Sequence, residues 1–231
     1  MIEIKEGALF IADAHYPHHG NAFFQILKKI ERKELHAPQI FLMGDIFDLL
    51  FGYNDYIKQP LSGTIALLEK LSKKHEIYYF EGNHDFCLET IFSNIKIYDR
   101  ASQPVYMGLE GKKIGISHGD IYEAGFWYGV YCFLLRNKVA LTLLKPFQKK
   151  IIDNRLAKLK VKNICAKLEH FEQKAKAISE HYQKDTNFII EGHFHQAKKL
   201  GRYISLPSLA CQEQVGAVID GEIHFIDIKD L

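Results

Sequence analysis

The chain of 231 residues is long enough for one domain with a substantial core, or for one domain with a lid. Hydrophobic residues make up 47% of the sequence and charged residues 25%, as is usual for soluble globular proteins. The formal net charge of +2 is far below the basic excess of most nucleic-acid-binding domains. We therefore expect no nucleic-acid partner.

The four cysteines are scattered along the chain and form no C-x-x-C pair: Cys87, Cys132, Cys165 and Cys211. This distribution favours buried or free thiols in a reducing compartment over a disulfide framework or a zinc ribbon. The first residues include acidic side chains and no long apolar stretch, so we predict no signal peptide. The expected location is the cytoplasm.

Short apolar runs alternate with helical patterns along the first part of the chain. Runs at 8–12, 39–43 and 77–80 predict buried strands, and the spacing of apolar residues at 21–33 and 62–73 predicts helices. Strand, helix, strand order predicts right-handed parallel crossovers, which place the loops after the strands at one sheet edge. Residues 95–117 and 187–227 are strand-like and broken by turns, so the chain as a whole indicates a two-sheet α/β sandwich.

Residues 121–185 are expected to form a helical insertion, or lid, within a single domain of residues 1–231. The insertion begins with a run rich in aromatic and aliphatic residues and continues with a charged helical pattern. Its longest uncharged part is about a dozen residues, where a membrane span needs about 20. Two interpretations stay open: ordinary helical packing, or a lid whose apolar face meets acyl chains or the bilayer surface.

Five apolar runs end in residues that can bind a metal ion. The carboxyl ends of parallel strands meet at the crevice where α/β proteins bind ligands. A turn, a helix cap or a satisfied core histidine is the commoner explanation of any one cluster, but five clusters favour a site. These residues are Asp13, His15, Asp45, Asp48, Asn83, His84, Asp85, His118, His193 and His195.

Carboxylate, amide and imidazole groups together could hold two divalent cations. Two such ions lie about 3.5 to 4 Å apart, need a bridging ligand, clamp a phosphoryl oxygen and lower the pKa of a bound water molecule. Mixed oxygen and nitrogen donors favour Mn2+, Fe or Zn over Mg2+ or Ca2+. We expect two divalent metal ions, with Mn2+ as the first choice and Fe or Zn as alternatives.

The order D-x-H, GD-x-x-D, GNHD, HGD and GH-x-H resembles the calcineurin-like metallophosphoesterase family over nearly the whole chain. The resemblance implies a four-layer αββα sandwich with a helical lid insertion, and a metal-dependent phosphoesterase. It also implies that one metal is held by Asp13, His15 and His195, that the other is held by Asn83, His118 and His193, and that Asp45 bridges them.

The resemblance gives His84 a catalytic role beside the metals. It is not a ligand in this family, and it would stabilise transition-state charge or protonate the leaving oxygen. Asp85 is expected to orient His84. Asp48 is expected to hold the metal ligands in place without binding a metal ion itself.

The insertion after His118 and the GD-x-x-D sequence resemble the UDP-2,3-diacylglucosamine pyrophosphatases of lipid A biosynthesis. Those enzymes release UMP and 2,3-diacylglucosamine 1-phosphate. Their commonest form has arginine where His84 stands here and threonine where Phe194 stands. The resemblance implies a UDP-linked glycolipid substrate and a peripheral location on the inner face of the cytoplasmic membrane. We expect no obligate protein partner. Candidate substrate contacts in the lid are Arg136, Lys149, Asn154 and Arg155.

Two other functions stay open. The chain could be another metallophosphoesterase, acting on a nucleotide, a nucleic acid or a phosphoprotein. It could also be a non-catalytic interaction module on the same fold. Every candidate ligand position is filled, which favours catalysis.

Overall fold

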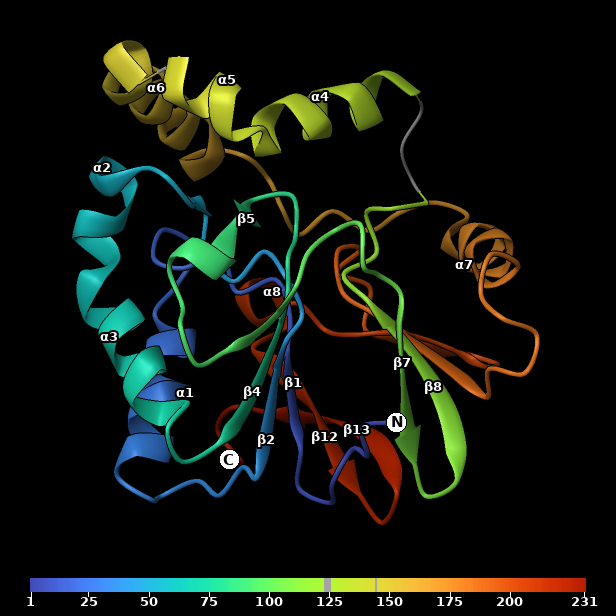
Figure 1. Ribbon diagram of the computed structural model, residues 1–231. Helices are drawn as coiled ribbons and strands as arrows, with labels where there is room; N and C mark the ends of the chain where they lie inside the picture. Colours follow the sequence, from blue (N-terminus) through green and yellow to red (C-terminus); the bar gives the residue numbers. More distant parts are fainter. Residues whose placement is uncertain (123–125, 144) are drawn as a thin grey trace.

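The strands predicted from the first three apolar runs lie side by side in one six-stranded sheet. The computed structural model describes residues 1–122, 126–143 and 145–231 (Figure 1). In this sheet β1, β2, β4 and β6 are parallel neighbours, and β12 and β13 continue it in antiparallel pairs beyond β1. The strands are β1 (Leu9–Ile11), β2 (Gln39–Leu42), β4 (Glu76–Phe80), β6 (Lys96–Tyr98), β12 (Gln214–Ile219) and β13 (Glu222–Asp227).

A second sheet of five strands has the order β10-β11-β9-β8-β7. Within the stretch predicted to be strand-like and broken by turns at 95–117, β7 and β8 pair antiparallel on either side of Gly111. Strands β8 and β9 are parallel, as are β9 and β11. The bounds are β7 (Val105–Leu109), β8 (Lys112–Ser117), β9 (Phe188–Glu191), β10 (Lys198–Leu200) and β11 (Tyr203–Ser205), with a separate short pair β3 (Leu50–Phe51) and β5 (Asp85–Phe86).

Alternate residues of the central strands face opposite layers. On β1, Leu9 and Ile11 pack toward the helices, whereas Phe10 packs between the two sheets. The rings of Phe10 and Phe41 stack at 4.5 Å, and those of Phe41 and Tyr78 stack at 4.9 Å, so aromatic rings from three neighbouring strands fill the space between the sheets. This buried layer fixes the register that brings the strand ends together.

Helices cover the outer face of each sheet, which completes the expected αββα sandwich (Figure 1). Helix α1 (Ala22–Glu31) buries Phe23, Leu27 and Ile30 against the six-stranded sheet beside α3 (Ser62–Leu71). Helix α7 (Phe171–Ser179) buries Phe171 and other apolar residues against the five-stranded sheet. Each fully buried Leu or Phe side chain contributes roughly 1.5 to 3 kcal/mol relative to exposure.

A group of helices lies over the end of the sandwich at which the predicted site residues gather (Figure 1). It contains α4 (Phe126–Arg136), α5 (Lys138–Leu143) and α6 (Gln148–Lys160). A 3-10 turn at Lys145–Phe147 directly precedes α6, and the short helix α2 (Asp55–Lys58) lies against α6. The predicted insertion also contains residues 123–125 and 144, which lie outside the described residues. In the described part of the chain, no helix is long and apolar enough to cross a membrane.

The charged helical pattern in the later part of the predicted insertion corresponds to two helices, α6 and α7. Residues 161–170 between α6 and α7 form no helix or strand. Helix α7 leaves the lid helices because its apolar face, with Phe171, Ala175 and Ile178, packs on the five-stranded sheet. The limits 121–185 for a lid within one domain stay a prediction.

The expectation of four free thiols is wrong for two of the cysteines. Cys165 and Cys211 form a disulfide, whereas Cys87 and Cys132 are free. Their separation of 46 residues carries no pairing signal in the sequence. The fold brings them together because the segment after α6 runs past α8 (Leu209–Gln212), which carries Cys211.

Candidate metal centre

The loops that follow the parallel strands converge on one buried site. Asp13 and His15 come after β1, Asp45 after β2, and Asn83 after β4. The second sheet adds His118 after β8, and His193 and His195 after β9. Three groups with ligand atoms within 4.8 Å of one another result: Asp13, His15 and His195; His15, Asp45 and His84; and Asp45, His118 and His193. The structure therefore brings together seven of the residues that the sequence singled out, and His15 and Asp45 each belong to two of the groups.

The backbone is strained where these residues stand. Asp13, His15, Asp45, His193 and His195 all have φ between 43° and 58°, a region that non-glycine residues rarely adopt. Such conformations cost on the order of 1 to 3 kcal/mol each and concentrate at functional sites. The fold thus gives up some stability to aim these side chains inward.

Glycines precede several of these residues because there is no room for a side chain. A Cβ at Gly44 would lie 2.3 Å from His118 Nδ1, and its φ of 84° is left-handed. A Cβ at Gly82 would lie 2.3 Å from Asp45 Oδ1. The glycines of the GD and GN motifs therefore allow the loops of two strands to approach each other across the site.

Main-chain carbonyls orient two of the histidines. Nδ1 of His118 donates to the Met43 carbonyl over 2.8 Å, and Nδ1 of His195 donates to the Ile164 carbonyl over 2.7 Å. A carbonyl can only accept, so each ring carries a proton on Nδ1, and its Nε2 faces the site. His118 Nε2 lies 3.7 Å from Asp45 Oδ1, and His195 Nε2 lies 3.2 Å from Asp13 Oδ1. This is the arrangement of metal-binding histidines, which donate the other ring N–H to an outer partner.

The donor set fits divalent cations. Nε2 of His15 is buried and has no hydrogen-bond partner within the part of the chain that the structure describes. A buried polar atom without a partner costs about 1 to 3 kcal/mol, and a bound cation would satisfy it. Oxygen and imidazole nitrogen donors suit Mn2+, Fe and Zn.

Burial and opposite charges compete at the centre of the site. Burial raises the pKa of Asp45, but the surrounding histidines, His84 and His118 first, outweigh it and hold this pKa well below its usual range. Burial lowers the pKa of His118, yet Asp45 and Asp13 raise it to about 9. At His15 the effect of burial exceeds that of the nearby carboxylates and lowers the pKa to about 3. Asp45 therefore stays ionised, and a cation can take the place of the protons on its neighbours.

His84 lies at the edge of the ligand groups with a fixed ring orientation. Its Nδ1 donates to the Asp48 carbonyl over 2.7 Å, and its Nε2 lies 3.9 Å from Asp45 Oδ2. Its backbone N–H donates to Asp45 Oδ1 over 2.8 Å. The ring therefore points its second nitrogen at the same space as the candidate ligands.

Asp85 does something other than orient His84. Its carboxylate accepts hydrogen bonds from the backbone N–H groups of Asp45, Ile46 and Gly82 and from the Tyr79 hydroxyl, over 2.6 to 3.0 Å. Burial and the nearby Asp45 raise the pKa of Asp85. Asp85 thus fixes the loop that carries Asp45, whereas the main chain at Asp48 holds the His84 ring.

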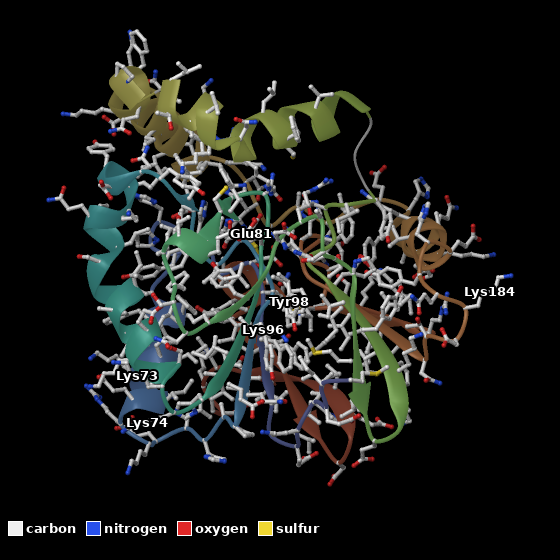
Figure 2. All side chains as sticks on the ribbon, viewed as in Figure 1. Lys73, Lys74, Glu81, Lys96, Tyr98 and Lys184 are labelled. Carbon is white, nitrogen blue, oxygen red and sulfur yellow. A yellow bond between two sulfur atoms is a disulfide. The ribbon has the colours of Figure 1, made fainter. Side chains whose placement is uncertain are left out.

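Another buried carboxylate, that of Glu81, lies close by, in the middle of the molecule. Figure 2 shows Glu81 near the centre, whereas Lys73, Lys74 and Lys184 lie at the periphery. Glu81 Oε1 accepts the backbone N–H of Leu88 over 2.8 Å, and burial raises its pKa to about 8. Glu81 therefore belongs to the support of the loop after β4.

Two cavities meet at Asn83 and His84. The first, called the polar cavity, is lined by the candidate ligands His15, Asp45, His193 and His195 and also by apolar residues such as Ile164 and Leu168. The second is mainly apolar and lies between the core and the lid helices; its walls are Leu49, Phe51, Asn54, Phe86, Leu141, Gln148, Ile151, Ile152 and Arg155, with Asn83 and His84. An apolar cavity thus opens directly beside the candidate metal ligands.

The four predicted substrate contacts of the lid lie in different environments. Arg155 lines the apolar cavity. Arg136 donates to the Gly82 carbonyl over 2.8 Å and lies over the Phe86 ring, so it joins the lid to the loop after β4. Lys149 and Asn154 are exposed on α6, away from both linings among the described residues.

Two polar residues that line the site were not among the predicted substrate contacts of the lid. Lys162 and Asn163 line the polar cavity, in the segment without helix or strand. Lys162 is indistinguishable in sequence from the other lysines of a solvated helix face. No spacing could have picked it out.

Comparisons with known proteins identify the family of this chain. A family model described as Calcineurin-like phosphoesterase matches residues 8–197, a range that includes all the candidate ligands. The UDP-2,3-diacylglucosamine hydrolase of Pectobacterium atrosepticum is 33% identical over 117 residues, which cover 48% of this chain and 47% of that protein. The chain thus spans about half the length of the first relatives that it matches.

Longer matches exist to proteins of the same name. That of Proteus mirabilis is 28% identical and covers 81% of each chain, and that of Blochmanniella pennsylvanica is 25% identical, covering 92% of this chain and 90% of the relative. Among solved structures, the phosphoesterase YfcE of E. coli aligns with 96% of this chain and 98% of its own at 14% identity, with a TM-score of 0.45. Since the family model covers most of the chain, this protein belongs to the calcineurin-like phosphoesterase family.

Proposed function

We propose that this protein is a dinuclear-metal hydrolase that cleaves the diphosphate of UDP-2,3-diacylglucosamine to UMP and 2,3-diacylglucosamine 1-phosphate, in lipid A biosynthesis. Relatives that carry the name of this activity support the reaction. The observation that carries the substrate is the junction of the polar and apolar cavities at Asn83 and His84. A diphosphate attached to acyl chains needs both environments side by side.

The two metal ions, with Mn2+ as the proposed species, would share Asp45. One would be held by Asp13, His15 and His195, and the other by Asn83, His118 and His193. The grouping of these side chains and the unpartnered Nε2 of His15 support this assignment. When bound, two divalent ions stabilise charge on a phosphoryl group and lower the pKa of a water molecule.

His84 would supply the proton that the leaving oxygen needs. With Nδ1 committed to the Asp48 carbonyl, a proton on Nε2 points into the site. From there it can reach a leaving oxygen or stabilise negative charge on the phosphoryl group. His84 also lines the apolar cavity, so its ring marks the boundary between the diphosphate and the lipid.

The acyl chains would occupy the apolar cavity. Burying acyl methylenes against Phe86, Leu141 and Ile151 contributes about 0.8 kcal/mol per CH2 group. At the polar end, Lys162 lines the cavity of the candidate ligands, where its ammonium can attract a diphosphate. Arg155, on the wall of the apolar cavity, is the second cationic contact proposed for the substrate.

A soluble substrate pair tests the cavity. The wild type should hydrolyse a UDP-diacylglucosamine analogue with short, soluble acyl chains at least about 10-fold faster, as kcat/KM, than UDP-glucosamine, because a few buried methylenes suffice for this ratio. Ile151→Asp should abolish the preference and leave hydrolysis of UDP-glucosamine unchanged. Val139→Asp, on an exposed lid residue outside the cavity lining, is the matched control and should keep the preference. Equal rates on both substrates in the wild type would contradict the lipid assignment.

The outer face of the lid supports a peripheral location on the inner face of the cytoplasmic membrane. Phe133, Leu134, Val139, Leu143 and Phe147 are each more than half exposed, with 72% exposure at Leu143. Lysines such as Lys149 and Lys150 are exposed on the next helix. Apolar side chains beside basic ones bind anionic bilayer surfaces.

Sedimentation with vesicles tests this location. The protein should bind vesicles that contain anionic lipid and should release at high salt. Leu143→Glu should weaken binding, whereas Ile219→Glu, which changes an exposed residue of the sandwich, should not. No difference between the two variants would count against the lid as the membrane-facing surface.

A further inference from the structure

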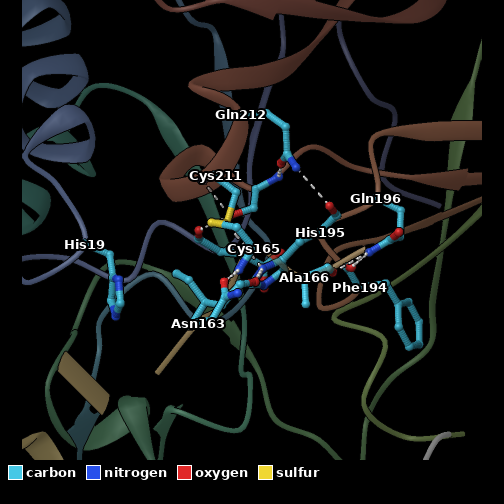
Figure 3. Close-up of a disulfide and its surroundings, with 12 residues drawn as sticks. His19, Asn163, Cys165, Ala166, Phe194, His195, Gln196, Cys211 and Gln212 are labelled. Atoms are coloured by element: carbon cyan, nitrogen blue, oxygen red, sulfur yellow. Dashed lines mark hydrogen bonds and ion pairs between the residues drawn. A yellow bond between two sulfur atoms is a disulfide. The ribbon is translucent and has the colours of Figure 1, made fainter. Parts of the chain in front are cut away.

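The segment between α6 and α7 crosses the site at His195 (Figure 3). Besides the Ile164 carbonyl that accepts from His195 Nδ1, Gln196 Oε1 accepts the backbone N–H of Leu168 over 3.2 Å. Gln196 Nε2 reaches the Ala166 carbonyl over 3.4 Å. These are exposed or partly buried hydrogen bonds, which contribute about 0.5 to 1.5 kcal/mol each.

Little apolar packing holds this segment in place. Cys165, Ala166 and Lys167 are exposed, and Val161 is 85% exposed. A ten-residue stretch without helix or strand loses much conformational entropy when it is fixed. The position of the Ile164 carbonyl therefore needs an additional restraint.

The disulfide supplies that restraint at the neighbouring residue. Cys165 is bonded to Cys211, whose Sγ lies 3.8 Å from His195 Nδ1 (Figure 3). Gln212, next along α8, donates from Nε2 to the His195 carbonyl over 2.9 Å. The disulfide therefore links the segment 161–170 to α8, the helix that also binds the His195 main chain.

Helix α8 also binds the main chain of Asp13, whose side chain lies beside that of His195. The backbone N–H of Ala210 and the hydroxyl of Ser208 both donate to the Asp13 carbonyl, over 3.2 and 2.8 Å. The side chains of Asp13 and His195 lie 3.2 Å apart, between Oδ1 and Nε2. One short helix is thus bonded to the Asp13 loop, to the His195 loop and, through sulfur, to the segment that orients the His195 ring.

We propose that Cys165 and Cys211 are positioning residues of the metal site, and that their disulfide holds the Ile164 carbonyl on His195. When the disulfide opens, the segment gains freedom and the His195 ring loses its outer partner. Loss of such a partner lowers metal affinity about 10- to 100-fold in known sites. The inference rests on the proposed metal site and is independent of the substrate.

The step that opens the bond is an ordinary reduction. A phosphine attacks one sulfur and breaks the Sγ–Sγ bond, and water then delivers oxygen to the phosphine. Two electrons pass from phosphorus to the sulfurs, and water supplies the two protons. The products are two thiols and the phosphine oxide, so no thiol reagent that could compete for metal is introduced.

The test compares the full-length double variant Cys165→Ser/Cys211→Ser with Cys87→Ser, a matched control at a free cysteine. Titration with Mn2+, followed by calorimetry, should show one site weakened about 10- to 100-fold in the double variant and the other unchanged. Cys87→Ser should bind like the wild type. In 15N-labelled, metal-free protein, the Nδ1–H signal of His195 should be slow to exchange in the wild type and lost in the double variant.

Wild type treated with a phosphine gives a second measurement that needs no mutation. Its Mn2+ affinity should fall as in the double variant and recover on reoxidation. Equal affinities and an unchanged His195 signal in the oxidised and reduced protein would overturn the proposal, as would four free thiols in the aerobically prepared wild type. Because the readouts are metal binding and a ring proton, they stand whether or not the lipid substrate is the right one.

Discussion

The carbonyl oxygen of Asp48 lies 2.7 Å from His84 Nδ1, and the carboxylate of the same residue accepts the backbone N–H and the Nδ1 of His18 over 2.8 and 2.7 Å. One buried residue therefore orients the candidate acid through its main chain and binds the loop after β1 through its side chain. The direction of the His84 ring depends on the shape of this loop. That dependence explains how a histidine can be held in a rigid site without a carboxylate partner at Nδ1.

The first prediction concerns His84 itself. His84→Ala should retain metal, since the three residues of each proposed ligand set and Asp45 remain, and kcat should fall by about 100-fold or more, the usual scale for one acid or charge-stabilising group. Metal content and steady-state rates measure the two effects separately. His75→Ala, which removes a ring bonded to the Ala37 carbonyl, is the control and should keep its rate. An unchanged rate in His84→Ala would remove the catalytic role.

Asp85 should matter for stability and metal binding. Asp85→Asn places an amide N–H2 where donors now converge, so at least one of the four hydrogen bonds is lost and a buried donor is left unpaired. The expected loss is about 1 to 3 kcal/mol, a drop in Tm of about 2 to 12 °C at about 2 to 4 °C per kcal/mol.

Weaker metal binding should accompany this drop, because the Asp45 loop loses its support. The control Asp99→Asn also removes a carboxylate that accepts a backbone N–H, that of Ser102, but at an exposed position. It should change Tm little. A thermal midpoint in Asp85→Asn equal to that of the wild type would show that the loop does not depend on the carboxylate.

Two glycine substitutions distinguish a steric clash at the site from a general effect of replacing glycine by alanine. Gly82→Ala should lower metal affinity and activity together, because the new Cβ would lie 2.3 Å from Asp45 Oδ1. Gly63→Ala, in α3 with nothing within 4 Å, should leave activity unchanged and stabilise the fold by about 0.5 to 1 kcal/mol. Normal metal binding by Gly82→Ala would mean that the loops after β2 and β4 are not locked together across the site.

Metal binding should depend on pH through His118. Its pKa in the metal-free protein is raised to about 9, so the ring is protonated at neutral pH and must lose a proton to bind metal. Affinity should therefore increase as the pH rises toward about 9 and level off above it. The same charge stabilises the metal-free fold fully below the ordinary pKa of 6.5, and this contribution is lost as pH rises through about 9.

Calorimetry in buffers of different ionisation enthalpy measures the protons released. About one proton per protein should appear at neutral pH from this ring. A metal affinity that stays constant from about pH 6.5 to about pH 9 would contradict the assignment of His118.

Much of the site was predictable because it is built at strand ends. The apolar runs before Asp13 and Asp45 marked buried strands, and the parallel pairing of these strands places the residues after them at one edge of the first sheet. In the second sheet, the parallel pair β8 and β9 places His118 and His193 side by side in the same way. The glycines of the motifs are required by contacts that the loops make. Local pattern and tertiary structure therefore agree at these positions.

Other features depend on tertiary contacts that leave no periodic signal. Ile164 and Lys162 reach the site from a segment without helix or strand, and Cys165 meets Cys211 because two distant segments cross. Arg155 lines a cavity and Lys149 does not, because the two residues lie on different sides of α6. Which side faces the core depends on tertiary packing. The role of Asp85 depends on which loop folds over it, which the motif alone does not reveal.

Hydrolysis of UDP-2,3-diacylglucosamine by the Mn2+-loaded protein in detergent, with products read by mass spectrometry, tests the central claim most directly. The wild type should release UMP and 2,3-diacylglucosamine 1-phosphate far faster than it turns over a small chromogenic phosphodiester. Asp45→Ala should lose both metal and activity. Turnover of the chromogenic diester without release of UMP would contradict the lipid assignment and leave a metallophosphoesterase with another substrate.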